Sequence, residues 1–360
     1  MQIQRSKLLD ALKLALSGCG EDQTFDAAIF HDGWLSSYNE TISVSARVED
    51  LAGLDATIKI KDFQKLVQKL KGDMIEITDS EGSLVLECGN THAELAKFPD
   101  AISQYIKALN LDKIQWTELP KDFSSMVALC RLDNHKFKFP MVAFDGTNVI
   151  ADEAIRANFG TLDAEMPKFS LHTAVAKELL AMGKLESYCL QDPWLHVFTA
   201  SGAIFSCKLH TEAYPIAQRL NKRKEIEGLT PVFTAPIPSD LAEVVGRVET
   251  FAVASATGPL AVTVQLTPEA MILKTSKEAG NVRESIFLDT ELPEGTDVCF
   301  EASVPYLREA AKKVQEFSLV EMPTKPKVPD MDPSQWPTVM MSTLLFRGPG
   351  FLQWVMVIAK

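Results

Sequence analysis

KDFQKLVQKL (Lys61–Leu70) and KDFSSMVALC (Lys121–Cys130) are near copies of one another at two places in the chain. In both stretches, apolar residues recur at positions i, i+3, i+4 and i+7, and this spacing forms one apolar stripe along a short α-helix. The opposite side of the first copy carries Lys61, Lys65 and Lys69. The two stretches therefore predict amphipathic helices, the first of them with a basic outer face.

Four further stretches fit the same template less closely. They lie within residues 6–16, 173–185, 239–248 and 304–314, so six helices are expected to begin near residues 6, 62, 121, 173, 239 and 304. These starts are roughly 52 to 66 residues apart, and a near-constant period with one structural unit per repeat indicates an internally repeated architecture. Six unrelated amphipathic helices in an ordinary globular chain are the alternative interpretation.

The charge of the chain is unevenly distributed. Its 360 residues, enough for two or three domains, carry a formal net charge of −12. Residues 59–71 nevertheless hold five lysines against one aspartate. A net negative charge disfavours a nucleic-acid partner, but an acidic body with basic faces repels DNA everywhere except at those faces. Composition therefore leaves a nucleic-acid partner open.

Targeting and redox signals favour the cytoplasm. We find no charged segment followed by an apolar segment at the start, and no apolar run long enough to span a bilayer, so we expect neither a signal peptide nor a membrane span. The cysteines show no CxxC spacing, and we expect reduced thiols rather than disulfides or a zinc site. They are Cys19, Cys88, Cys130, Cys189, Cys207 and Cys299.

Alternating apolar residues between the helices predict strands. Hairpin turns are expected at Asp32-Gly33, at residues 79–82 and at Asp145-Gly146. Residues 112–119 (DKIQWTEL) read as a strand with Ile114 and Trp116 on one face. Residues 323–337 hold five prolines and are expected to form a surface loop, because proline cannot donate to a sheet.

The repeat phase divides the chain into three domains. Residues 221–227 (NKRKEIE) are charged and poor in apolar residues, and they are the best candidate for a linker. We predict domains at residues 1–119, 120–228 and 229–360. Each would hold two β-α-β-β-β halves, giving an α+β fold with all helices on one side of their sheets.

Catalytic and metal-binding motifs are absent from the sequence. There is no GxxxxGK[ST], GxGxxG, HExxH or GxSxG, and the histidines lack ligand spacing. Asp330 and Asp332 fit a solvated acidic loop better than a metal site. Cys207 and His210, three apart on a predicted strand, point to opposite faces and cannot act as a nucleophile and base. We therefore expect no enzyme activity, no metal and no cofactor.

Five segments resemble one family of proteins, the bacterial sliding clamp or β subunit of DNA polymerase III. Their order and spacing extend the resemblance over nearly the whole chain. The segments are HDGWLSSYNETISVSARV (residues 31–48), DATIKIKDFQKLVQKLKG (55–72), DGTNVIADEAIRA (145–157), EAYPIAQRL (212–220) and DVCFEASVPYLREAAKKV (297–314).

The resemblance implies a head-to-tail homodimer whose six similar domains close into a ring around duplex DNA. Helices would line the hole and sheets would form the rim, so the chain would be half of the ring. Basic residues on the inner helices would contact phosphates without reading sequence. The DNA-binding candidates are Lys7, Lys13, Lys61, Lys65, Lys69, Lys121, Lys136, Lys138, Arg247, Lys312 and Lys313.

The family also tethers polymerases and clamp loaders through short peptides held in an apolar pocket between its second and third domains. The matching positions are Ile155, Arg156, Leu260, Tyr306, Trp354, Val355 and Met356, although Leu260 and Val355 fit equally well as core residues. The sequence departs from the family where GHRL becomes EAIR and where the ending MPMRL becomes MVIAK. The edge strand near Ile114 and Trp116 would form the dimer interface.

Two further hypotheses differ from a processivity clamp in class. One is a clamp-fold interaction scaffold or decoy that binds clamp partners without encircling DNA. The other is an enzyme, for which the sequence offers no site.

Overall fold

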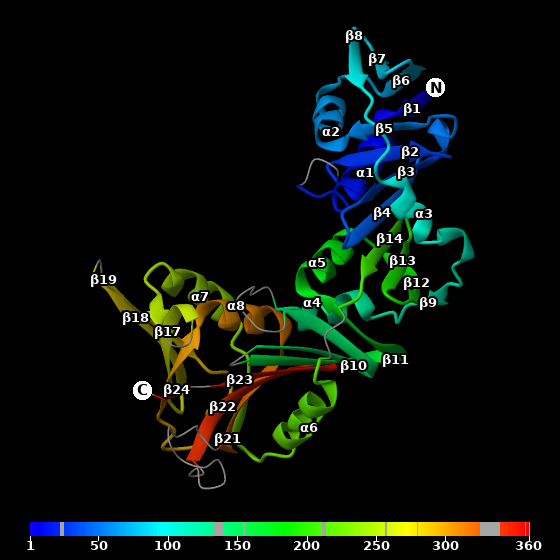
Figure 1. Ribbon diagram of the computed structural model, residues 1–360. Helices are drawn as coiled ribbons and strands as arrows, with labels where there is room; N and C mark the ends of the chain where they lie inside the picture. The colour runs from blue at the N-terminus through cyan, green and yellow to red at the C-terminus, as the bar shows by residue number, and fades with distance from the viewer. Residues whose placement is uncertain are drawn as a thin grey trace, which may run out of the picture. The chain divides into compact units, whose positions relative to one another are not determined.

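The computed structural model describes residues 1–21, 25–132, 140–153, 156–210, 214–255, 258–278, 280–324, 339–356 and 358–359 (Figure 1). The chain forms two compact units. One contains residues 1–124 and 169–212, and the other contains residues 125–168 and 213–360. The second predicted domain is thus divided between the two units.

All six predicted helices are confirmed. In α1 and α7 the four predicted stripe residues are all buried, and in α2 the buried Phe63 ring contributes about 1.5–3 kcal/mol by leaving water. The six helices are α1 (Arg5–Leu16), α2 (Ile60–Lys69), α4 (Phe123–Cys130), α5 (Thr173–Ala181), α7 (Leu241–Glu249) and α8 (Val304–Lys313).

The first unit contains two antiparallel sheets. The smaller has the order β1-β6-β7-β8, from β1 (Gln2–Gln4), β6 (Met74–Ser80), β7 (Ser83–Cys88) and β8 (Thr91–Ala96). The larger has the order β5-β2-β3-β4-β14-β13-β12-β9. Its strands are β2 (Ala27–His31), β3 (Trp34–Tyr38), β4 (Ile42–Arg47), β5 (Ala56–Lys59), β9 (Thr117–Glu118), β12 (Leu185–Gln191), β13 (Trp194–Thr199) and β14 (Ile204–Lys208).

The second unit also contains two sheets. One has the order β10-β11-β23-β22-β21-β15, from β10 (Met141–Glu153), β11 (Arg156–His172), β15 (Pro231–Pro236), β21 (Glu316–Thr324), β22 (Val339–Gly348) and β23 (Phe351–Met356). The other has the order β19-β18-β17-β20-β24, with β16 paired to β17. Its strands are β16 (Val253–Ser255), β17 (Gly258–Leu266), β18 (Ala270–Lys277), β19 (Gly280–Phe287), β20 (Val298–Ser303) and β24 (Ile358–Ala359).

Two of these sheets join different predicted domains. Strand β4 of the first domain pairs with β14 of the second, from Ile42↔Cys207 to Ser45↔Ile204. Strand β11 of the second domain pairs with β23 of the third, from Arg156↔Val355 to Gly160↔Phe351. Continuous sheets across both junctions explain why the compact units divide the second predicted domain. Its limits at residues 120 and 228 stay predictions.

The expected linker is a helix. Residues 221–227 belong to α6 (Ile216–Glu227), which packs Ile216 and Ile226 against Ala157 and Phe159 of β11. Successive residues of a strand point to opposite faces, and Asn158 bonds to α4 instead. The expectation that all helices lie on one side of their sheets is therefore wrong for α6.

Two local expectations are corrected as well. The predicted hairpin turn at Asp145-Gly146 lies inside the continuous strand β10, where glycine adopts the positive φ of 60°. Only two residues of the expected strand at 112–119 are strand, because a 3-10 turn occupies Leu111–Lys113. A short unpredicted helix, α3 (Ser103–Ala108), precedes that turn.

Most of the expected proline-rich loop lies outside the described residues, and its first two residues, Pro323 and Thr324, end β21 instead. All six cysteines are free thiols, and burial raises the pKa of Cys130 to about 12. In the part of the chain described, no helix is long and apolar enough to cross a membrane.

Candidate nucleic-acid and partner-binding surfaces

Helix α2 is fixed to the larger sheet of the first unit by its apolar side. The Phe63 ring meets the Phe30 ring of β2 edge-on, with centroids 6.0 Å apart, and Val67 is fully buried one turn later. Because the apolar stripe is anchored, the opposite side of the helix is held toward solvent. The position of the basic face is therefore set by core packing.

The lysines of α2 are exposed and weakly paired. Lys61, Lys65 and Lys69 are all exposed. The Nζ atom of Lys61 lies 3.5 Å from Asp26, and that of Lys65 lies 3.9 Å from Asp62. Ion pairs of this length between exposed groups contribute little stability and exchange readily with other anions. The three amines are available to an external anion.

Helix α1 adds further exposed bases. Lys7 lies 3.3 Å from Asp50 and Lys13 lies 3.2 Å from Asp10, with both lysine side chains about 60% exposed. Lys121 is exposed just before α4. The predicted DNA-binding residues of the first domain thus stay at the surface, each beside at most a weak local partner.

Arg247 of α7 forms ion pairs with two glutamates of the same chain. Arg247 donates to Glu243 at 2.6 Å and to both carboxylate oxygens of Glu284 at 3.0 and 3.1 Å. The hydrogen bonds to Glu284 raise the pKa of Arg247 and lower the pKa of Glu284. This part of the predicted lining is electrically neutralised.

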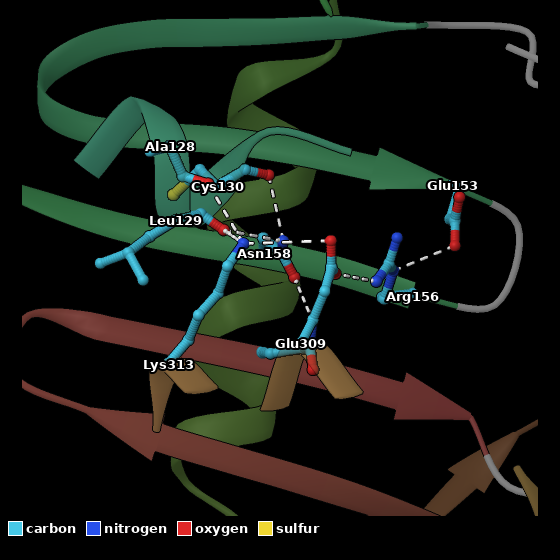
Figure 2. Close-up of polar contacts among 9 residues, drawn as sticks. Ala128, Leu129, Cys130, Glu153, Arg156, Asn158, Glu309 and Lys313 are labelled. Atoms are coloured by element: carbon cyan, nitrogen blue, oxygen red, sulfur yellow. Dashed lines mark hydrogen bonds and ion pairs between the residues drawn. The ribbon is translucent and has the colours of Figure 1, made fainter. Parts of the chain in front are cut away.

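The two adjacent lysines of α8 differ. Lys312 is exposed. The amine of Lys313 donates to the carbonyl oxygens of Ala128 at 3.1 Å and Leu129 at 3.3 Å, at the end of α4 (Figure 2). Burial lowers the pKa of Lys313, although the nearby Glu309 opposes this. Of the two predicted contacts, only Lys312 faces solvent freely.

Arg156, a predicted pocket residue, is buried in an ion-pair cluster. Its side chain is 3% exposed. It donates to Glu153 at 3.1 Å and to Glu309 of α8 at 2.5 Å (Figure 2). With two carboxylates already bound, the guanidinium connects β11 to α8.

The other predicted pocket residues do not share one face. Trp354 packs in the apolar cluster against α6. Val355, paired with Arg156 across the sheet, points to the opposite face because it is the next residue of the strand. Leu260 is half-buried on β17 of the neighbouring sheet.

Some predicted residues cannot be placed by their side chains. Lys136, Lys138 and Ile155 lie outside the described residues. Tyr306 belongs to α8 and Met356 ends β23, but only their backbone is described.

The predicted interface residues lie in a short irregular stretch. Ile114 and Trp116 precede β9, which pairs with β12 through Thr117↔Tyr188. The Trp116 ring is 38% exposed and packs against Phe198, with centroids 5.5 Å apart. The strand on which the interface prediction relied is therefore much shorter than expected.

A second polar cluster, on the α6 side of the sheet, was not predicted. Asp152 accepts hydrogen bonds from the Tyr214 hydroxyl and from Arg219, the latter at 2.6 Å. Burial raises the pKa of Asp152, and both partners oppose that shift. Among the described residues, no group of His, Cys, Asp or Glu side chains could hold a metal ion.

No protein-family model and no curated protein matches the chain. Solved structures match over its full length. The β subunit of DNA polymerase from Streptococcus pyogenes has 16% identity and a TM-score of 0.73, covering 100% of this chain and 99% of its own. The Bacillus subtilis sliding clamp has 13% identity, a TM-score of 0.73 and coverage of 100% and 98%. A griselimycin-bound clamp from Pseudomonas aeruginosa has 14% identity, a TM-score of 0.73 and coverage of 100% and 99%.

The chain therefore has the three-domain α+β fold of a sliding clamp. Solved proteins that share it include the β subunit of DNA polymerase III from Thermotoga maritima, at 14% identity. The resemblance seen in the sequence is confirmed at the level of the fold.

Proposed function

We propose that the protein is a DNA sliding clamp that closes around duplex DNA as a head-to-tail homodimer in the cytoplasm and tethers a polymerase. The observation that carries this proposal is the exposed, weakly paired lysine face of α2 in a clamp fold. The proposal involves no chemical step and no cofactor.

Electrostatics supply the contact with DNA. Amines of α1 and α2 would replace counterions on the phosphate backbone, so binding is independent of sequence and weakens with salt. The net charge of −12 repels DNA from other surfaces. Retention would come from enclosure, so a modest number of phosphate contacts is sufficient.

Ring closure follows from the internal repeat. Four strands meet at the two junctions within the chain, and three of them end a three-strand meander: β4 after β2 and β3, β14 after β12 and β13, and β23 after β21 and β22. The fourth, β11, follows β10. The corresponding strands of the two remaining sheets are β8 and β19, and each is the outermost strand of its sheet. We propose that β8 of one subunit pairs with β19 of the other, in place of the contact predicted at Ile114 and Trp116.

Exposed aromatic residues at these edges support the same pairing. Phe287, at the end of β19, is 77% exposed, and Phe98, just after β8, is 40% exposed. A Phe287→Asp substitution should convert dimers to monomers in light scattering. The control is Val232→Asp, at a residue 51% exposed on β15, which should leave the mass unchanged. If Phe287→Asp stays dimeric, the proposed edge is wrong.

Polymerase and clamp-loader peptides would bind near Leu260, Tyr306, Val355 and Met356, with Trp354 supporting that surface from the α6 side of the sheet. Arg156 would have a supporting role there, since its guanidinium already binds two carboxylates. Ile155 keeps its predicted role.

The test of the function uses DNA topology. The purified protein, loaded onto a nicked plasmid by a clamp loader, should stay on the circle through gel filtration and dissociate when a restriction enzyme cuts it. Equal retention on circular and linear DNA would contradict enclosure.

A scaffold or decoy that does not encircle DNA is the second candidate. Arg247 and Lys313 of the third predicted domain favour it, because both side chains already bind acceptors of the same chain. Such a protein would bind clamp-partner peptides yet be absent from the plasmid fraction. The same experiment, repeated with a labelled polymerase peptide, separates the two.

A further inference from the structure

The C-terminal end of α4 has carbonyl groups that need partners. The last four carbonyls of a helix lack a donor within it, and a glycine after the helix commonly provides for them. No glycine follows Cys130, where the sequence continues Arg131-Leu132. The Val127 carbonyl accepts a local backbone bond from Arg131 at 2.9 Å.

Side chains from distant segments bind the other three carbonyls. Lys313 of α8 donates to Ala128 and Leu129. Asn158 of β11 donates to Leu129 at 3.3 Å and to Cys130 at 3.0 Å. Figure 2 shows both side chains reaching the same helix end. Lys313 also places positive charge at the negative end of the helix dipole.

Both donors are held by further contacts. The Asn158 carbonyl oxygen accepts from the Gln353 amide at 3.0 Å, and both residues are almost fully buried. Lys313 lies 4.0 Å from Glu309, the same carboxylate that binds Arg156. These contacts hold both donors independently of their bonds to α4.

The charges of the cluster balance. Glu153 and Glu309 supply two negative charges, and Arg156 and Lys313 supply two positive charges. A buried charge is costly unless it is paired, and without Lys313 the guanidinium of Arg156 would be the remaining ion-pair partner of both glutamates. The amine of Lys313 is therefore needed where it is and is withdrawn from external anions.

We propose that Lys313 and Asn158 form an external C-cap of α4, and that Lys313 positions this helix against α8 instead of contacting DNA. The cap makes α4, of the second predicted domain, and α8, of the third, move as one body. Lys312, its exposed neighbour, is then the phosphate-binding residue of the pair. This last point rests on the proposed function, whereas the cap does not.

Hydrogen–deuterium exchange on the full-length protein tests the cap. A cap contribution of about 1–2 kcal/mol predicts that Lys313→Ala accelerates exchange of the α4 amides by roughly 5–30-fold. Lys313→Arg, which keeps a cationic donor, should restore most of the protection. Lys312→Ala is the matched control and should change nothing there. Exchange in β17 and β18 should be unaffected in all three variants, which shows that the chain remains folded.

Unchanged α4 exchange in Lys313→Ala, or equal acceleration in Lys312→Ala, would overturn the cap. A second readout concerns DNA. Lys312→Ala should reduce the salt slope of plasmid binding by about 0.9, while Lys313→Ala leaves it unchanged. A reduced slope in Lys313→Ala would overturn the assignment. If Lys312→Ala has no effect while the exchange result holds, the cap stands and the phosphate contact fails.

Discussion

The helix pair α1 and α2 and the helix pair α7 and α8 share one structural template but use their basic residues differently. The lysines of α1 and α2 are exposed beside weak partners. In the second pair, Arg247 bridges two glutamates and Lys313 caps another helix. Basic residues on the predicted lining helices therefore differ in how strongly acceptors of the chain hold them. Among the predicted DNA-binding residues that the structure describes, most of the exposed ones lie in the first predicted domain.

Arg156 and Arg247 provide the largest contrast, because each binds two glutamates but only Arg156 is buried. Arg156→Ala should destabilise the protein by about 3–5 kcal/mol, since Glu153 remains buried and unpaired. Arg247→Ala should change stability little, because its partners stay solvated. Urea unfolding of the two variants checks this. Similar losses in both would remove the distinction between buried and exposed bases.

The histidines show the same contrast between a buried and an exposed side chain. His196 is 1% exposed and bonds to Ser206 at 2.8 Å, and burial lowers its pKa to about 4. Unfolded histidine titrates near 6.5, so the unfolded chain binds this proton first as the pH falls. Stability should be full above about 6.5 and fall by up to about 3 kcal/mol on approaching pH 4.

The measurement for His196 is the free energy of unfolding from pH 7.5 to 4. His196→Gln should flatten the curve in that window. The control His92→Gln removes an exposed histidine beside Glu87 and should leave the shape unchanged. A wild-type curve identical to that of His196→Gln would mean that folding does not shift the pKa of His196.

The smallest expected effect concerns DNA binding. A Lys65→Ala, Lys69→Ala double variant should reduce the slope of log K against log salt by about 1.8, at about 0.9 for each phosphate that a lysine no longer neutralises. Arg247→Ala should leave the slope unchanged because its charge is already neutralised. Titrations at four salt concentrations measure both. If Arg247→Ala reduced the slope more than the double lysine variant does, the α7 arginine and not the α2 lysines would be the main contact with DNA.

Local periodicity made the six template helices predictable: the stripes of α1 and α7 are wholly buried, and the stripe of α2 is buried except at the half-buried Leu66. Helix α6 was missed because its apolar residues, Ile216, Leu220 and Ile226, are sparse and Ile226 lies inside the charged run of residues 221–227. Strand β8 was not predicted, because its segment THAELA is short and has no fully buried residue, with only Ala93 and Leu95 half-buried.

The sequence predicted which basic residues lie on the template helices. It could not predict which of them stay exposed and which bind acceptors of the same chain. Nothing in the local sequence distinguishes Lys312 from Lys313, since the acceptors of Lys313 lie 184 and 185 residues away. The role of Asn158 is likewise set by Leu129 and Cys130 across the fold. Tertiary contacts of this range leave no periodic signal in the sequence.

Whether the α2 lysines face enclosed DNA can be decided by amine acetylation with mass spectrometry. The protein is labelled free and after loading onto closed circular DNA. We predict that Lys65 and Lys69 react rapidly in the free protein and become protected on the circle, while Lys313 reacts slowly in both states. Equal reaction of Lys65 and Lys69 in the two states would contradict enclosure of DNA against this face.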